Sequence, residues 1–197
     1  MKEIWDQRYD TDEYVYGIKS NSFFAEQLNK LSPGSIILPC EGEGRNAVFA
    51  ASTGWKVIAF DQSTSGKTKA LKLADENKVA IDYRICDALD FSVAENSIDV
   101  VAFIYAHFPE TTRKKVHENA MKWLKPGGKI IIEAFNKNQL KNSSGGPKDI
   151  SLLYSEEMLR EDFSLLKIEL LQSFEIELQE GNLHKGNADV IRFVGKK

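Results

Sequence analysis

Apolar and polar positions follow two repeat patterns that alternate along most of the chain. Short apolar runs typical of buried strands occupy 35–38, 55–60, 81–85, 98–104 and 129–135. Between them, apolar residues recur at the spacing of an amphipathic helix. These helical stretches cover 22–31, 45–53, 66–78 and the segment after Thr111 or Thr112. Regular alternation of strand and helix predicts a parallel sheet with helices on both faces.

The pattern changes after the fifth predicted strand. Residues 137–149 are polar and contain Gly-Gly-Pro, which predicts a loop, and a short helix is expected over 155–162. Two strand-like stretches follow at 174–178 and 189–194, joined by a turn over 179–187. The chain is therefore predicted to form an α/β fold with a seven-stranded mixed sheet. Five strands are parallel, and a C-terminal antiparallel hairpin completes the sheet.

Length and composition favour one soluble domain over 1–197. The chain has 197 residues, of which 42% are hydrophobic and 28% charged, as in globular proteins. The net charge is -3 and no segment concentrates Lys and Arg, so a nucleic-acid partner is not expected. The N-terminus lacks the apolar run of a signal peptide and no segment reaches membrane-spanning length. We expect a cytoplasmic protein without a membrane partner, either a monomer or a homodimer.

Cysteine and histidine usage gives no metal site. Cys40 and Cys86 lie in different segments, which suits free thiols in a reducing compartment. The three histidines are scattered along the chain. We therefore predict no bound metal.

The chemistry is expected at the carboxyl ends of the parallel strands, where open α/β sheets bind ligands. After the first strand, Gly42 and Gly44 allow the backbone to approach a ligand closely and to turn into a helix. Asp61 ends the second strand, where a carboxylate suits two ribose hydroxyls. This arrangement predicts a nucleoside-bearing cofactor. Because GEGRNA also fits the dinucleotide pattern G-x-G-x-x-A, NAD(P) remains a rival at this point.

Three further features distinguish between the possible cofactors. Cys86-Asp87-Ala88 ends the third strand, KPGG precedes the fifth, and a hairpin replaces a second nucleotide-binding half. Over nearly the whole chain these features resemble the class I S-adenosylmethionine (SAM)-dependent methyltransferases, which have a Rossmann-like fold. The segments WDQRY, EYVYG, EGEGRNAVFAA and FDQS more narrowly resemble the tellurite-resistance and thiopurine-methyltransferase-like branch.

The resemblance implies roles for individual residues. Glycines of the loop would line the methionine part of SAM, Asp61 would hold the ribose, and Asp87 with the Ala88 N–H would contact the adenine. The N-terminal segment 1–17, which contains Trp5, would cover the site as a lid. The cofactor-binding residues implied are Glu41, Gly42, Glu43, Gly44, Asp61, Gln62, Ser63, Asp87, Ala88 and Tyr9.

The glycine loop departs from the usual family motif at two positions. That motif carries an acid where this chain has Leu38 and a first glycine where it has Cys40. Here the acids stand later, at Glu41 and Glu43, and either one would take over the contact with the SAM ammonium group.

Methyl transfer from a sulfonium requires alignment and desolvation, because the methyl group is already activated. A general base is needed only when the acceptor carries a proton on its nucleophile. His107, beside Tyr105 at the end of the fourth strand, is the candidate base, and these two are the catalytic candidates. Arg45 either binds an anionic substrate or holds Glu41 or Glu43. The acceptor-contacting candidates are Tyr16, Arg45, His107 and His184.

The acceptor is expected to be a small molecule. The fourth strand is not followed by the Asn/Asp-Pro-Pro-aromatic sequence of many adenine and amide methylases. A small thiol, a chalcogen oxyanion or a small carboxylate remains as acceptor of an in-line displacement. An NAD(P)-binding oxidoreductase and a non-catalytic SAM-binding regulator are the alternative functions.

Overall fold

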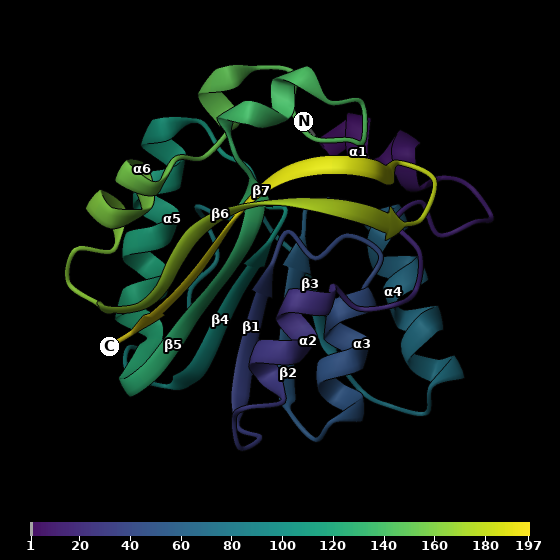
Figure 1. The fold of residues 1–197 in the computed structure, drawn as a ribbon. Coiled ribbons are helices and arrows are strands. Elements are labelled where there is room, and N and C mark those ends of the chain that lie inside the picture. Colours follow the sequence, from purple (N-terminus) through teal and green to yellow (C-terminus); the bar gives the residue numbers. More distant parts are fainter. Residues whose placement is uncertain (1) are drawn as a thin grey trace.

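A seven-stranded sheet runs through the computed structural model, which describes residues 2–197 (Figure 1). Its strand order is β3-β2-β1-β4-β5-β7-β6. The first five strands pair in parallel, and β7 lies antiparallel to both β5 and β6. The predicted fold class is confirmed. The strands are β1 (Ser35–Pro39), β2 (Lys56–Asp61), β3 (Asp82–Ile85), β4 (Ile98–Ile104), β5 (Leu124–Phe135), β6 (Lys167–Glu180) and β7 (His184–Lys196).

Helices cover both faces of this sheet (Figure 1). One layer contains α2 (Ser22–Leu28), α3 (Arg45–Ser52) and α4 (Thr64–Glu76), and the other contains α5 (Glu110–Trp123) and α6 (Glu156–Asp162). Along β1, Ile37 packs in the cluster under α5 and α6, while Ile36 and Leu38 pack in the cluster under α2 and α3. A strand buried on both faces needs a continuous apolar run, which is why the sequence predicted this strand well.

The N-terminal helix α1 (Lys2–Tyr9) was not predicted as a helix. Its sequence, KEIWDQRY, carries few apolar residues, so its periodicity gives a weak signal. The helix is positioned by tertiary contacts with α4, among them hydrogen bonds from the start of α4 to Asp6. Met1, the first residue of the expected lid 1–17, lies outside the described residues.

The C-terminal hairpin is longer than predicted. The strands expected at 174–178 and 189–194 belong to β6 and β7, and the expected turn 179–187 shrinks to 181–183 because its flanks pair in the ladder. Cross-strand hydrogen bonds extend the strands through polar residues, whose individual propensities favoured a turn. Glu180 and His184 therefore face each other at the tip as a strand pair.

Two other connections differ in detail from the expectation. The KPGG segment lies inside β5, where the pairing with β4 jumps from Leu124 to Lys129, so it forms a bulge in place of a turn before the strand. The 137–149 loop begins with the 3-10 helix η1 (Lys137–Lys141), and η2 (Ile150–Leu152) follows it. Over residues 2–197, no helix has the length and apolar character needed to cross a membrane.

Candidate functional site

The glycine loop connects β1 to α3 and takes left-handed backbone conformations at several positions. Gly42 has φ 60° and Gly44 has φ 89°. A Cβ on Gly44 would collide with Ala70 of α4, and a Cβ on Gly42 would lie 2.6 Å from the Tyr9 hydroxyl of α1. The glycines are thus required both by the backbone turn and by close approach of neighbouring elements. Cys40, at the usual position of a first glycine, also has positive φ, at 55°.

Glu41 caps the helix that follows the loop. Its Oε1 accepts the backbone N–H groups of Asn46 (2.8 Å) and Ala47 (2.7 Å) at the N-terminus of α3. Burial raises the pKa of this carboxyl group to about 7. Its second oxygen has only the Asn46 side-chain amide, at 3.5 Å, as a partner among residues 2–197.

Glu43 is bound to the N-terminal segment instead. Its carboxylate accepts the backbone N–H groups of Val15 (3.2 Å) and Tyr16 (3.3 Å) and pairs with Lys69 of α4 at 2.7 Å. Both side chains of the ion pair are largely buried. Of the two glutamates, Glu41 therefore has the more weakly engaged oxygen, with one contact of 3.5 Å to the Asn46 side chain.

Arg45 has a different partner from those expected. One guanidinium nitrogen donates to the backbone oxygens of Tyr16 (3.3 Å) and Lys19 (3.4 Å), and the other pairs with Glu180 of β6 at 2.8 Å. The side chain thus joins the N-terminal segment to the hairpin. This arrangement occupies the guanidinium group without a ligand.

Asp61 links the end of β2 to the glycine loop. Its two carboxylate oxygens accept one backbone N–H each, from Gly42 (3.1 Å) and from Ser63 (2.8 Å). The residue is 8% exposed, and burial raises its pKa. Each oxygen retains a lone pair that accepts a further hydrogen bond, which is the requirement for holding a ribose diol.

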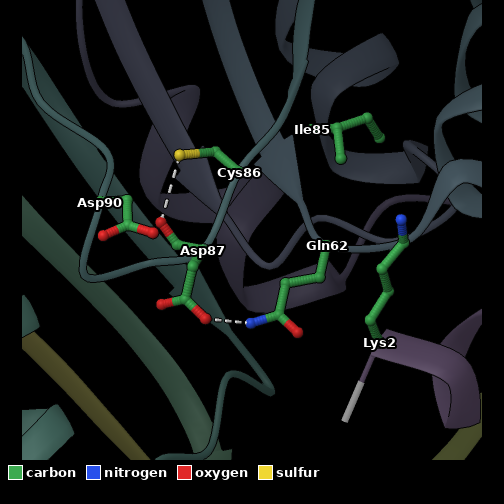
Figure 2. Close-up of a pocket in the computed structure, with 6 residues that line it drawn as sticks. All are labelled: Lys2, Gln62, Ile85, Cys86, Asp87 and Asp90. Atoms are coloured by element: carbon green, nitrogen blue, oxygen red, sulfur yellow. Dashed lines mark hydrogen bonds between the residues drawn. The ribbon is translucent and has the colours of Figure 1, made fainter.

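A pocket of about 320 Å³ lies beside this residue at the ends of β2 and β3 (Figure 2). The Gln62 side-chain amide donates to the Asp87 carboxylate across it, and the other Asp87 oxygen accepts the Leu89 N–H at 2.9 Å. An apolar wall beside an amide and a carboxylate suits a flat heterocycle with an exocyclic amine. The pocket is lined by Lys2, Gln62, Ile85, Cys86, Asp87 and Asp90. The side chain of the neighbouring Ala88 is buried in the core.

Helix α1 extends from this pocket, which Lys2 lines, to the glycine loop, where Tyr9 lies close to Gly42. Asp6 accepts hydrogen bonds from the Ser63 hydroxyl (2.7 Å) and from the Thr64 N–H (2.7 Å) at the start of α4. Tyr9, which is 5% exposed, stacks on Trp5 with 5.6 Å between ring centroids. The N-terminal segment is therefore anchored over the predicted cofactor site.

The structure gives His107 a protein partner at both ring nitrogens. Its Nδ1 lies 2.8 Å from the Leu152 carbonyl oxygen, and its Nε2 accepts the Phe135 N–H at 3.4 Å. Burial lowers its pKa to about 4. The ring therefore serves as a neutral link between the end of β4, β5 and η2, and it has no nitrogen left for an acceptor molecule.

Tyr105 directly follows β4 and has a positive φ of 54°. Its hydroxyl donates to Glu133 at 3.0 Å, and Glu133, fully buried, also accepts from Arg192 at 2.6 Å and from Asn21. Burial raises the Tyr105 pKa well above its usual value, so the hydroxyl stays protonated. Tyr105 is thus a fixed aromatic wall at the strand ends.

Four aromatic rings meet at the mouth of the site, and we call them the His184 cluster: Tyr16, Tyr105, Phe135 and His184. The His184 ring lies 4.5 Å from Tyr16, 4.6 Å from Tyr105 and 5.3 Å from Phe135, between ring centroids. The cluster unites two expected acceptor-contacting residues with one of the catalytic candidates. His107 contacts it only through Phe135.

Several polar residues of this region were missed in the sequence. Asn21, Glu133 and Glu180 form a hydrogen-bonded group in which the Asn21 amide bonds both carboxylates. In the sequence each stands among ordinary strand or loop residues. One signal for this group was present in the sequence. Glu133 stands inside the otherwise apolar run IIIEAF of β5, where a solvent-exposed side chain is not expected. Among residues 2–197, no group of three or more His, Cys, Asp and Glu side chains could hold a metal ion.

Comparison with known proteins agrees with this geometry. Residues 38–128 match a family model described as a methyltransferase domain. The chain is 24% identical over 185 residues to the thiopurine S-methyltransferase of Legionella pneumophila (strain Corby), which covers 85% of this chain and 80% of that protein. It is also 27% identical over 141 residues to phosphoethanolamine N-methyltransferase 1 of Zea mays, but it spans only 28% of that protein's length.

Solved structures show the same fold at lower sequence identity. TehB from Haemophilus influenzae has a TM-score of 0.73 at 16% identity, covering 100% of this chain and 66% of that one. The N-methyltransferase NodS from Bradyrhizobium japonicum, solved with S-adenosyl-L-homocysteine, has a TM-score of 0.71 at 15% identity and covers 100% and 97%. Residues 38–128 therefore resemble a methyltransferase domain, and the whole chain shares the fold of TehB and NodS.

Proposed function

We propose that this protein transfers a methyl group from SAM to a small thiol. The observation that carries the proposal is Asp61, which is tied to Gly42 of the glycine loop and lies beside the pocket at the ends of β2 and β3. The glycine loop, the Asp61 carboxylate and the pocket follow one another along the adjacent ends of β1, β2 and β3. This is the order of the amino-acid tail, the ribose and the base in a nucleoside with an amino-acid tail.

The residues at these strand ends fit SAM part by part. Asp61 would accept the ribose hydroxyls, and the pocket with Gln62 and Asp87 would hold the adenine. The second oxygen of Glu41 would face the ammonium group, which replaces the contact that an acid at the position of Leu38 makes in the usual motif. When bound, SAM supplies an activated methyl group on a sulfonium.

The protein's own contribution is alignment and exclusion of water. Asp6 and Tyr9 anchor α1 over the loop, while Glu43 and Arg45 fix the following segment through its backbone. Residues 2–17 would therefore form the cover that separates the reacting atoms from solvent.

Charge pairing favours a thiol over an oxyanion or carboxylate acceptor. Three cationic side chains around the acceptor mouth are each engaged with a carboxylate, which weakens their attraction for an anionic acceptor, while Arg8 donates to the Tyr16 hydroxyl at 3.0 Å. The pairs are Arg45–Glu180 (2.8 Å), Arg192–Glu133 (2.6 Å) and Lys69–Glu43 (2.7 Å). The similarity to a thiopurine S-methyltransferase over most of both chains also supports a sulfur acceptor.

Calorimetric titration with SAM, S-adenosylhomocysteine and NAD(P)H tests the cofactor. We expect SAM and its product to bind, and Asp61→Asn to weaken binding about tenfold or more, because hydrogen bonds to a charged group contribute roughly 1.5–3 kcal/mol. Asp82→Asn, at an exposed carboxylate paired with Arg84, is the matched control. Binding of NAD(P)H alone would overturn the proposal. Binding of SAM without turnover of any thiol would favour a non-catalytic regulator.

The wider expectations remain predictions. We expect a cytoplasmic protein with one domain over 1–197, a small-molecule partner, no nucleic-acid or membrane partner, and a monomer or homodimer. Ultracentrifugation of the purified chain checks the last of these.

A further inference from the structure

We propose that His184 is the proton acceptor of the reaction and that its Nε2 takes the proton of the thiol acceptor. This inference rests on the proposed function, because it assigns the residue that prepares the nucleophile for the same methyl transfer. It also replaces His107, whose two ring nitrogens are both engaged by the protein.

Glu180 orients the imidazole of His184. His184 Nδ1 lies 3.5 Å from Glu180 Oε2, and the same oxygen is held by Arg45 at 2.8 Å. A carboxylate accepts hydrogen bonds, so this contact selects the tautomer with hydrogen on Nδ1. Nε2 then carries a lone pair, and no hydrogen-bond partner for it occurs within the described chain. Glu180 is accordingly a positioning residue.

The His184 ring lies near the carboxyl ends of the parallel strands. His184 packs against Tyr105 at the end of β4 and against Phe135 at the end of β5, on the side of the sheet where the strand-end loops gather (Figure 1). Tyr16 of the N-terminal segment covers it. The ring therefore belongs to the same mouth as the glycine loop, to which Tyr16 is bound through Glu43.

A glycine turn at Gly145 packs against the edge of the ring that carries Nε2. A Cβ on Gly145 would lie 3.3 Å from Nε2 and 2.7 Å from Cδ2, so the turn over the ring edge leaves no room for a side chain. Gly145 has φ 121°, which favours glycine independently. The edge of the imidazole that carries the lone pair thus faces the glycine turn, and an acceptor would reach Nε2 by displacing this turn.

The other nucleophilic or basic side chains are less suited. His117 Nδ1 bonds Asp162 at 2.8 Å, and although its Nε2 lacks a partner, the ring is fully buried between α5 and α6. Burial raises the pKa of the Cys40 thiol well above its usual value. Of the three histidines, only His184 combines an available nitrogen with a place at the strand ends.

Electrostatics support the assignment. Burial opposes ionisation of Glu180, but the hydrogen bond from His184 and the charge of Arg45 lower its pKa to about 2, so it stays anionic. Burial lowers the His184 pKa from its usual value, and Glu180 partly offsets this. The imidazole is therefore neutral at pH 7, and Glu180 favours the positive charge that the ring gains with a proton. The titratable and charged groups that face it are Glu180, Arg45, Arg8, Tyr16 and Tyr105.

The step balances as follows for a neutral thiol. The acceptor sulfur forms a bond to the methyl carbon while its proton moves to His184 Nε2. The bond between the methyl group and the sulfonium breaks, and its electron pair remains on the donor sulfur. The products are a thioether, S-adenosylhomocysteine and an imidazolium paired with Glu180, which releases its proton to water.

Two thiols of different acidity test the proposal on the full chain. At pH 7, 2-mercaptoethanol is protonated and 4-nitrothiophenol is ionised, so only the first requires a base. We expect His184→Gln to lower kcat/KM for 2-mercaptoethanol by about 10²-fold, the usual contribution of a general base, and to change it little for 4-nitrothiophenol. Lys185→Gln, at the exposed neighbour on β7, is the matched control and should change neither.

The outcomes separate this inference from the proposed function. Equal losses for both thiols, or no loss for either, would overturn the role of His184 while leaving methyl transfer intact. If calorimetry shows SAM binding but neither thiol is methylated by the wild-type protein, the thiol acceptor and the inference are both wrong. Failure of the wild-type protein to bind SAM would overturn the proposed function itself. Unchanged SAM affinity in His184→Gln confirms that the variant is folded.

Discussion

At the scale of single residues, the glycine loop uses its two glutamates to hold different parts of the chain. Glu41 caps α3 within the loop's own helix, whereas Glu43 reaches across to the backbone of Val15 and Tyr16. Glu41 thereby stabilises the start of α3 in a loop that has Cys40 where the usual motif has a first glycine. The same loop fixes the helix behind the cofactor site and the segment in front of it.

The pKa of Glu41 predicts a pH-dependent loss of stability. Its folded-state pKa of about 7 exceeds the ordinary value of 4.5, so the folded chain binds the proton more tightly than the unfolded chain. The stabilisation is therefore complete below pH 4.5 and is lost as the pH rises to 7, by at most about 3 kcal/mol. In urea titrations, Glu41→Gln should flatten this decline between pH 5 and pH 8. An unchanged slope would show that Glu41 titrates normally.

At the scale of elements, α1 contacts both the start of α4 and the glycine loop. Asp6 caps α4, and Tyr9 contacts the backbone face of Gly42. Gly66 of α4 also packs closely against Tyr9, since a Cβ on Gly66 would lie 3.1 Å from the Tyr9 ring. A nucleoside bound at the proposed site would therefore be coupled to the position of this helix.

Removal of this cover should stop turnover. Deletion of residues 1–17 is expected to abolish methyl transfer, because water would reach the reacting atoms and the aromatic wall formed by Tyr16 would be lost. Asp6→Ala, which removes only the hydrogen bonds to α4, should lower kcat less. Steady-state assays with SAM and a thiol measure both, with Asp10→Ala at an exposed neighbour as control. Full activity in the truncated protein would show that the segment is not a lid.

At the scale of the whole molecule, α5 and α6 are joined by a charged group inside the core. Arg113 pairs with Asp162 at 2.7 Å, and His117 bonds the same carboxylate at 2.8 Å, with all three side chains buried. Burial opposes ionisation of Asp162, but the hydrogen bonds from His117 and Arg113 lower its pKa below the usual value. The group attaches α6, and with it the start of the hairpin, to the parallel part of the sheet.

Breaking this group should be costly. Asp162→Asn leaves the buried Arg113 without a counter-charge, so we expect the free energy of unfolding to fall by roughly 3–5 kcal/mol. Asp82→Asn removes an exposed ion pair to Arg84 and should cost under about 1 kcal/mol. Urea denaturation compares the two variants. A loss for Asp162→Asn no larger than that of the control would mean that the buried pair contributes little.

Local patterns in the sequence determined the parallel half of the fold and placed the glycine loop and Asp61 at strand ends. Buried strands such as 98–104 need an unbroken apolar run, and the glycines and Asp61 lie at strand ends whatever the rest of the chain does. The N-terminal helix and the full length of the hairpin were not predictable in this way, because contacts between distant segments stabilise them.

Tertiary structure alone decided which polar residues act together. The sequence makes both His107 and His184 candidates for contact with the acceptor. Packing engages both ring nitrogens of His107 and leaves one ring nitrogen of His184 available. Arg45 finds Glu180, 135 positions away, in place of a neighbour in its own loop. Hydrogen bonds between such distant residues depend on how the hairpin and the N-terminal segment meet over the sheet. Periodicity and spacing carry no information about that meeting.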